Sequence, residues 1–176
     1  MEPIAITLIV VGVLVAAVLV WAYRVAHRLD RLHVRTDLAT QALEAALDRR
    51  AVVARAIAAA LRERDDEELV ALGGKLVIEA DRAEAAPFAE RETPENEVSL
   101  VLSRVASATR GIVPHPTELI AEISDAQTRV ILARRFYNDA VRDTRALQTR
   151  RGVRWLRLGG HAKLPEYFEI IERVST

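Results

Sequence analysis

The sequence contains no cysteine, which excludes disulfides, a thiol nucleophile and a thiolate metal site. Glycine and proline number only 7 and 6 in 176 residues, too few for a chain of many short strands and tight turns. A surplus of positive charge is also missing, because 25 basic residues face 25 acidic ones. Zero net charge argues against a nucleic-acid partner, which needs excess basic residues. What is abundant is alanine, the strongest helix former, so composition predicts an all-α protein of one domain, or one domain plus an anchor.

One long uncharged segment occupies residues 4–23. Its sequence is IAITLIVVGVLVAAVLVWAY, in which Thr7 is the only plainly polar residue. Twenty helical residues span about 30 Å, the thickness of the hydrocarbon core of a bilayer. Trp21 and Tyr23 close the segment where the aromatic belt of a membrane helix is expected. We therefore predict that residues 1–23 form a transmembrane anchor.

Two other interpretations of this segment fit less well. A cleaved signal peptide has a basic n-region, a shorter apolar core and a small-x-small cleavage site. Here only Met1, Glu2 and Pro3 precede a long and bulky run. A buried core helix that is apolar on all sides needs a larger protein around it. A retained membrane helix is therefore the prediction.

Basic residues follow the apolar segment. Between residues 24 and 35 Asp30 is the only acid, and the bases are Arg24, Arg28, Arg31 and Arg35. Flanks rich in arginine stay in the cytoplasm. We expect a single pass through the cell membrane, with the N-terminus outside and residues 24–176 inside. The residues assigned to the membrane interface are Trp21, Tyr23, Arg24, Arg28 and Arg31.

Residues 25–61 contain neither glycine nor proline, and apolar or small side chains recur there at three- and four-residue spacing. This register indicates a long amphipathic helix with a coiled-coil-like stripe. Two polar residues, Thr36 and Arg50, fall on the stripe. We expect the membrane helix to continue into this helix without a break.

Three further helices are expected. The second is placed at 66–86, where a run of acids suits a helix N-terminus, although Gly73 and Gly74 weaken the pattern. Residues 87–92 are expected to be a loop. The third helix begins at Thr93-Pro94, an N-cap followed by proline at the first helical position, and runs to about residue 109. Gly111 and the prolines at 114 and 116 break the chain again, and the fourth helix runs over 117–149.

The predicted architecture is all-α, with a single N-terminal transmembrane helix that continues into an antiparallel bundle of about four long helices. Residues 1–23 are the anchor, 24–149 the bundle, and 150–176 a basic, partly helical C-terminal tail. Glycines at 152, 159 and 160 are expected to bend this tail.

Several segments resemble the LemA family. RRFYNDAVR at 134–142 is similar to the arginine-rich turn, aromatic-Tyr-Asn and Val-Arg that mark this family near the end of a long helix. LEAALDRRAVV at 43–53, LIAEISDAQTRVILARR at 119–135 and PEYFE at 165–169 resemble further family segments in the same order. The resemblance implies a divergent member, hence a helical bundle on a membrane anchor. It implies no established reaction and no catalytic residues.

Motifs of catalysis and cofactor binding are missing from the sequence. None of the four histidines forms an i, i+4 pair, and H-E-x-x-H, G-x-S-x-G and a complete P-loop do not occur. Asp30 and His33 have the spacing of half a metal site, but such a pair is far more often a solvated helix face. We therefore predict no catalytic residue, no cofactor and no metal.

The conspicuous residues near 134–142 have two interpretations. On a helix, Arg134, Tyr137 and Asn138 lie on one side. Facing Arg49 or Arg50 of the first helix, they would form a polar clamp that fixes the register between long helices. The functional alternative is an anion or ligand site built from the same arginines. The clamp is the favoured interpretation.

Charge is unevenly distributed along the chain. Residues 62–97 hold twelve acids and five bases, a net charge of −7, and residues 145–163 hold six bases and no acid. With helices running up and down, the fourth helix returns residues 145–163 to the membrane surface, where Trp155 among arginines suits an anionic interface. Alternatively, Val153, Trp155 and Leu158 cap the bundle core, and the two interpretations are not exclusive. The residues expected to contact anionic lipid or a partner protein are Arg150, Arg151, Arg154, Trp155 and Arg157.

Two functions remain open from the sequence. The favoured one is a non-enzymatic scaffold or adaptor at the inner face of the membrane, whose partners are the bilayer and either another protein or a second copy associating through helices. The alternative is a ligand sensor or enzyme that uses the Arg134, Tyr137 and Asn138 face. The missing nucleophile, metal and phosphate motifs favour the scaffold.

Overall fold

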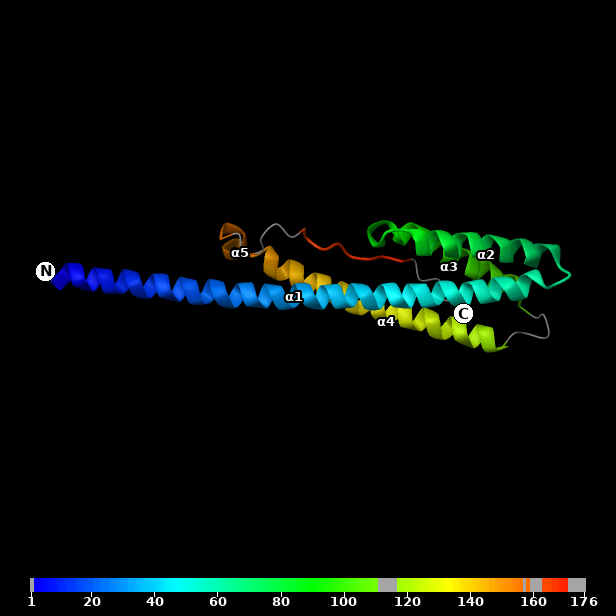
Figure 1. The fold of residues 1–176 in the computed structure, drawn as a ribbon, viewed down its shortest axis with the longest axis horizontal. Coiled ribbons are helices and arrows are strands. Elements are labelled where there is room, and N and C mark those ends of the chain that lie inside the picture. Colours follow the sequence, from blue (N-terminus) through cyan, green and yellow to red (C-terminus); the bar gives the residue numbers. More distant parts are fainter. Residues whose placement is uncertain (1, 111–116, 157, 159–162, 171–176) are drawn as a thin grey trace. The chain divides into compact units, whose positions relative to one another are not determined.

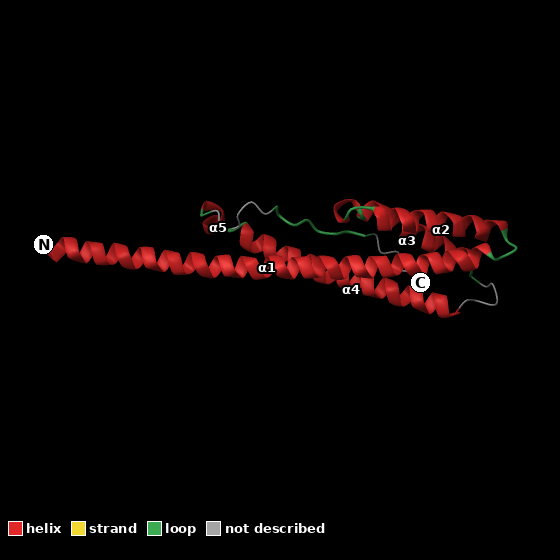
Figure 2. Ribbon diagram, in the orientation of Figure 1, coloured by secondary structure: helices red, strands yellow, loops and turns green. Residues whose placement is uncertain are grey.

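The computed structural model describes residues 2–110, 117–156, 158 and 163–170. Over these residues the chain forms five α-helices and one 3-10 turn, and no strand (Figure 1; Figure 2). The all-α class is thus confirmed for the described part of the chain. The elements are α1 (Glu2–Arg62), α2 (Glu67–Ala85), the 3-10 turn η1 (Phe88–Glu90), α3 (Glu92–Ala108), α4 (Thr117–Gln148) and α5 (Arg151–Trp155).

α1 is one continuous helix of 61 residues, which confirms that the apolar segment runs unbroken into the amphipathic one (Figure 2). Its composition explains the continuity, because Pro3 lies in its first turn and Gly12 is its only glycine. Nothing therefore interrupts the ladder of backbone hydrogen bonds. By length and composition the first part of α1 can cross a membrane, and none of that apolar window is buried against the chain.

The stripe predicted along residues 25–61 is the buried face of α1. Leu43 and Leu47 are fully buried, and the two polar residues on the stripe, Thr36 and Arg50, are buried as well. Contacts divide the chain into two compact units that each include part of α1. Unit 1 comprises residues 1–38 and 138–166, and unit 2 comprises residues 39–137 and 167–176. The three-part division into anchor, bundle and tail is a division by role and stays a prediction.

In unit 2, α2 and α3 pack together and against the second part of α1 (Figure 1). α2 lies within one residue of its predicted bounds at each end, and Asp66 is its N-cap. The Asp66 carboxylate accepts hydrogen bonds from the backbone N–H groups of Glu68 and Leu69, at 2.9 and 3.1 Å. Gly73 is buried against α1, and a Cβ there would lie 2.8 Å from the carbonyl oxygen of Ala58. The glycine that weakened the sequence pattern therefore permits close helix packing.

The predicted start of α3 is wrong. The helix begins at Glu92, its N-cap is Arg91, and no side chain caps it, so Thr93 is not the N-cap and Pro94 is not the first helical residue. The reason is that η1 leads directly into α3: the Arg91 N–H donates to Phe88 O at 3.3 Å, and Arg91 already has helical backbone angles. Pro94 still lies in the first turn, where its missing N–H leaves no hydrogen bond unmade.

α4 occupies Thr117–Gln148, close to the predicted 117–149. The break expected at 111–116 lies outside the described residues. In unit 1 the end of α4 and α5 pack against α1 (Figure 1). Their shared core is Leu29, Leu147 and Val153, with Val25, Leu32 and Leu158 against it. Within the predicted tail the structure has one short helix, α5, at Arg151–Trp155.

Candidate functional site

Unit 2 contains a network of four charged side chains, of which three are buried. Arg50, Arg91 and Glu95 are at most 4% exposed. Arg91 donates to Asp48 at 2.7 Å and to Glu95 at 2.9 Å, and Arg50 binds the Glu95 carboxylate and donates to Ser99 at 3.2 Å. The charges of the two arginines and two acids balance, and the side chain of the fourth member, Asp48, is 49% exposed. Burial lowers the pKa of Arg91, but hydrogen bonds and charge from Asp48 and Glu95 outweigh it and leave the pKa raised.

The two α1 arginines of the predicted clamp have acidic partners on other helices. Arg50 pairs with Glu95 of α3, as described above, and Arg49 pairs with Glu122 of α4 at the surface. Tyr137 is buried and Asn138 is half-buried. Arg50 thus has a partner that the sequence analysis did not single out, and its pairing with Tyr137 and Asn138 stays a prediction. The sequence did contain a signal for this ion pair, because Arg50 occupies an inward position of the stripe. A buried arginine needs an acid nearby to compensate its charge.

An aromatic cluster holds the extended C-terminal segment of unit 2. Phe168 is buried and stacks on Phe88 with ring centroids 5.0 Å apart, and Tyr137 meets Phe88 edge-on at 5.3 Å. The backbone is also tied, because Arg134 donates to the carbonyl of Ile170 at 3.3 Å. The residues that resemble a family signature therefore anchor this segment in the structure.

The membrane-interface residues lie on the exposed surface of α1. Trp21 is 43% and Tyr23 66% exposed, and the Tyr23 hydroxyl is 2.9 Å from His27 Nε2. Arg24, Arg28 and Arg31 are also exposed. Both the aromatic pair and the arginines are thus exposed, and their place at a membrane interface stays a prediction.

In the basic tail, some residues fit the core-capping interpretation and others fit contact with the membrane. Val153 is buried in the unit 1 core and Leu158 packs against it, as the core-capping interpretation predicts. Trp155, in contrast, is 85% exposed, so it does not cap the core. Its neighbours Arg150, Arg151 and Arg154 are exposed too, and Arg157 lies outside the described residues. A Cβ on Gly152 would lie 2.8 Å from the Trp21 ring, which places α5 beside the aromatic end of the apolar segment.

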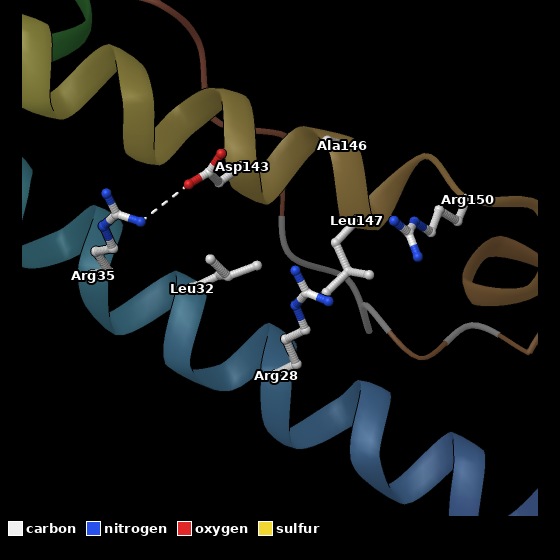
Figure 3. A pocket seen from close by; sticks show the side chains of 7 residues that line it. All are labelled: Arg28, Leu32, Arg35, Asp143, Ala146, Leu147 and Arg150. Atoms are coloured by element: carbon white, nitrogen blue, oxygen red, sulfur yellow. Dashed lines mark hydrogen bonds and ion pairs between the residues drawn. The ribbon is translucent and has the colours of Figure 1, made fainter.

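A pocket of about 280 Å³ lies between α1 and the end of α4 within unit 1 (Figure 3). Arg28 and Arg150, which the sequence analysis put in separate groups, lie in the same pocket. The lining residues are Arg28, Leu32, Arg35, Asp143, Ala146, Leu147 and Arg150. Arg35 donates to Asp143 at 3.0 Å across it. This pocket does not include Arg134, Tyr137 or Asn138, the residues of the alternative ligand site.

The fold and the site define only a class: over the described residues this is an all-helical protein whose long first helix begins with an exposed apolar segment. Among the described residues, no group of three or more histidines or acids is arranged to hold a metal ion. Comparisons with protein-family models, with curated proteins and with solved structures give no match to this chain. They neither support nor refute the resemblance to the LemA family, which stays a prediction.

Proposed function

We propose that this chain is a single-pass membrane protein of LemA-like type, whose helices act as a non-enzymatic scaffold or adaptor on the cytoplasmic face of the cell membrane. The observation that carries the proposal is the exposure of the apolar side chains of residues 4–23. These residues form the first part of α1, contain no charge, and leave their large apolar side chains exposed, as at Ile9 (66%) and Leu14 (60%). Such a surface is costly in water and stable in lipid.

The arginines that follow the apolar segment support the orientation. Arg24, Arg28 and Arg31 are exposed and lie immediately beyond Tyr23. Since positive flanks are retained in the cytoplasm, residues 24–176 are assigned to the inner face. Exposed Trp155 and the exposed arginines of α5 support the bilayer as a partner of the tail, and Gly152 of the same helix lies beside Trp21.

The ion pairs of unit 2 support a scaffold over a ligand sensor. Arg49 and Arg50 of α1 are engaged by glutamates of α3 and α4, so their charges fix helix packing. Exposed apolar side chains, such as Ile78 at 65%, offer contact sites for a protein partner or a second copy. A photo-crosslinking residue at position 78 is expected to capture a protein in native membranes, and capture of none would contradict the adaptor role.

Membrane anchoring is tested by alkaline carbonate extraction of the full-length protein. The wild type is expected to stay in the membrane pellet. Val10→Arg/Leu14→Arg is expected to release it, because each arginine near the helix centre costs about 2.5–3.5 kcal/mol of insertion free energy.

A matched control lies farther along the same helix. Val34 and Leu38 are 52% and 60% exposed, the same fractions as Val10 and Leu14. Val34→Arg/Leu38→Arg is therefore expected to leave the protein in the pellet. Extraction of the wild type, or equal extraction of both double variants, would contradict the anchor.

A further inference from the structure

Two arginine side chains, Arg28 and Arg150, line the unit 1 pocket. Figure 3 shows their guanidinium groups on either side of the Leu147 side chain. Within the described part of the chain, neither side chain has an ion pair or a hydrogen bond. Two positive charges in one pocket repel each other, and an anion bound there would offset that repulsion.

The rest of the pocket adds to the positive charge. Its lining contains three arginines and one acid, so its net charge is +2. Arg35 uses the one acid, Asp143, at 3.0 Å, which leaves Arg28 and Arg150 uncompensated. Leu32 and Leu147 form an apolar wall that reduces competition from water. Guanidinium groups beside such a wall are suited to donate hydrogen bonds to the oxygens of a phosphate.

The pocket also lies at the depth of lipid headgroups. Arg28 is five residues beyond Tyr23, a rise of about 7.5 Å along a helix. The headgroup layer beyond the hydrocarbon is about 5–8 Å thick on each side of a bilayer. Arg150 immediately precedes α5, and Gly152 of α5 contacts Trp21. Both arginines therefore reach the headgroup layer when Trp21 and Tyr23 sit at the interface.

We propose that this pocket binds the phosphate of an anionic lipid headgroup, with Arg28 and Arg150 as its ligands. The inference rests on the proposed function, because a headgroup reaches the pocket only if residues 4–23 span the bilayer. Basic pockets beside membrane helices on the cytoplasmic side are suited to such headgroups. A soluble phosphate ester presents the same chemical group, and the experiment separates the two sources.

The test is native mass spectrometry of the full-length protein in detergent, with phosphatidylglycerol or phosphatidylcholine added. The expected result is one retained phosphatidylglycerol per chain and no retained phosphatidylcholine. Arg28→Gln/Arg150→Gln is expected to weaken retention about ten-fold or more. The charge-matched control Arg104→Gln/Arg135→Gln changes two exposed arginines outside unit 1 and is expected to retain the lipid.

Three results would overturn the inference. Retention that does not saturate at one lipid, or an equal loss in Arg31→Gln/Arg151→Gln, would show diffuse attraction to arginines near the interface. Displacement of the lipid by millimolar glycerol 1-phosphate would assign the pocket to a soluble ester. Helix content by circular dichroism checks that each variant is folded. Carbonate extraction of the same variants separates the two proposals, because failure of the pocket with full membrane retention leaves the anchor intact.

Discussion

At the scale of single residues, the most constrained position in unit 2 is Glu95. Its carboxylate serves both buried arginines, Arg50 and Arg91, and it is 1% exposed. Removal of one member of such a cluster is costly, because the remaining charges stay buried without compensation. By contrast, the pair that Arg49 forms with Glu122 lies at the surface, with both side chains more than 40% exposed. Water and salt screen this second pair.

This difference predicts unequal effects of the same substitution. Glu95→Gln is expected to lower the free energy of unfolding by about 3–5 kcal/mol, because buried Arg50 would lose its acidic partner and Arg91 would keep only Asp48. Glu122→Gln is expected to lower it by less than about 1 kcal/mol. Denaturant unfolding of the full-length protein in detergent, followed by circular dichroism, measures both. Similar losses in the two variants would show that the network does not act as a buried unit.

At the scale of helices, the contact of α2 with α1 depends on Gly73. A Cβ there would lie 2.8 Å from the Ala58 carbonyl oxygen, and this neighbour is backbone that cannot rotate away. Gly74, the next residue in the same helix, has no atom within 4 Å of its Cβ position. The pair therefore separates the effect of helix propensity from the effect of packing.

Alanine at these two positions is expected to act in opposite directions. Gly73→Ala should lower the free energy of unfolding by about 1–3 kcal/mol, because the helices must move apart. Gly74→Ala should raise it by about 0.5–1 kcal/mol, because alanine favours an open helix position. Thermal unfolding of both variants under one condition makes the comparison. A stabilised Gly73→Ala would contradict the close contact.

Local chemistry made the helices predictable, whereas tertiary pairing limited prediction of the sites. Asp66 and the acids after it mark the start of α2, and the absence of breakers between residues 25 and 61 marks the length of α1. The start of α3 was missed because the chain enters it through η1, which no capping signal reveals. The pocket was missed because Arg28 and Arg150 lie far apart in the sequence and meet only when α4 packs against α1.

At the scale of the whole molecule, the account depends on the exposed apolar part of α1. The segment and the arginines beyond it lie on one uninterrupted helix, so insertion of the segment would fix where the following residues emerge. The proposed scaffold role, the proposed orientation and the proposed lipid pocket all depend on this step. The pairing of Tyr137 and Asn138 with the arginines of α1 is independent of it, because register within the helices requires no membrane.

Membrane topology, measured by cysteine labelling in intact cells, tests the central claim most directly. The natural chain has no cysteine, so one substitution creates the only reactive thiol. With a membrane-impermeant maleimide, Glu2→Cys is expected to react in intact cells. Glu63→Cys, at an exposed position near the end of α1, is expected to react only after permeabilisation. Labelling of Glu63→Cys in intact cells would contradict the account.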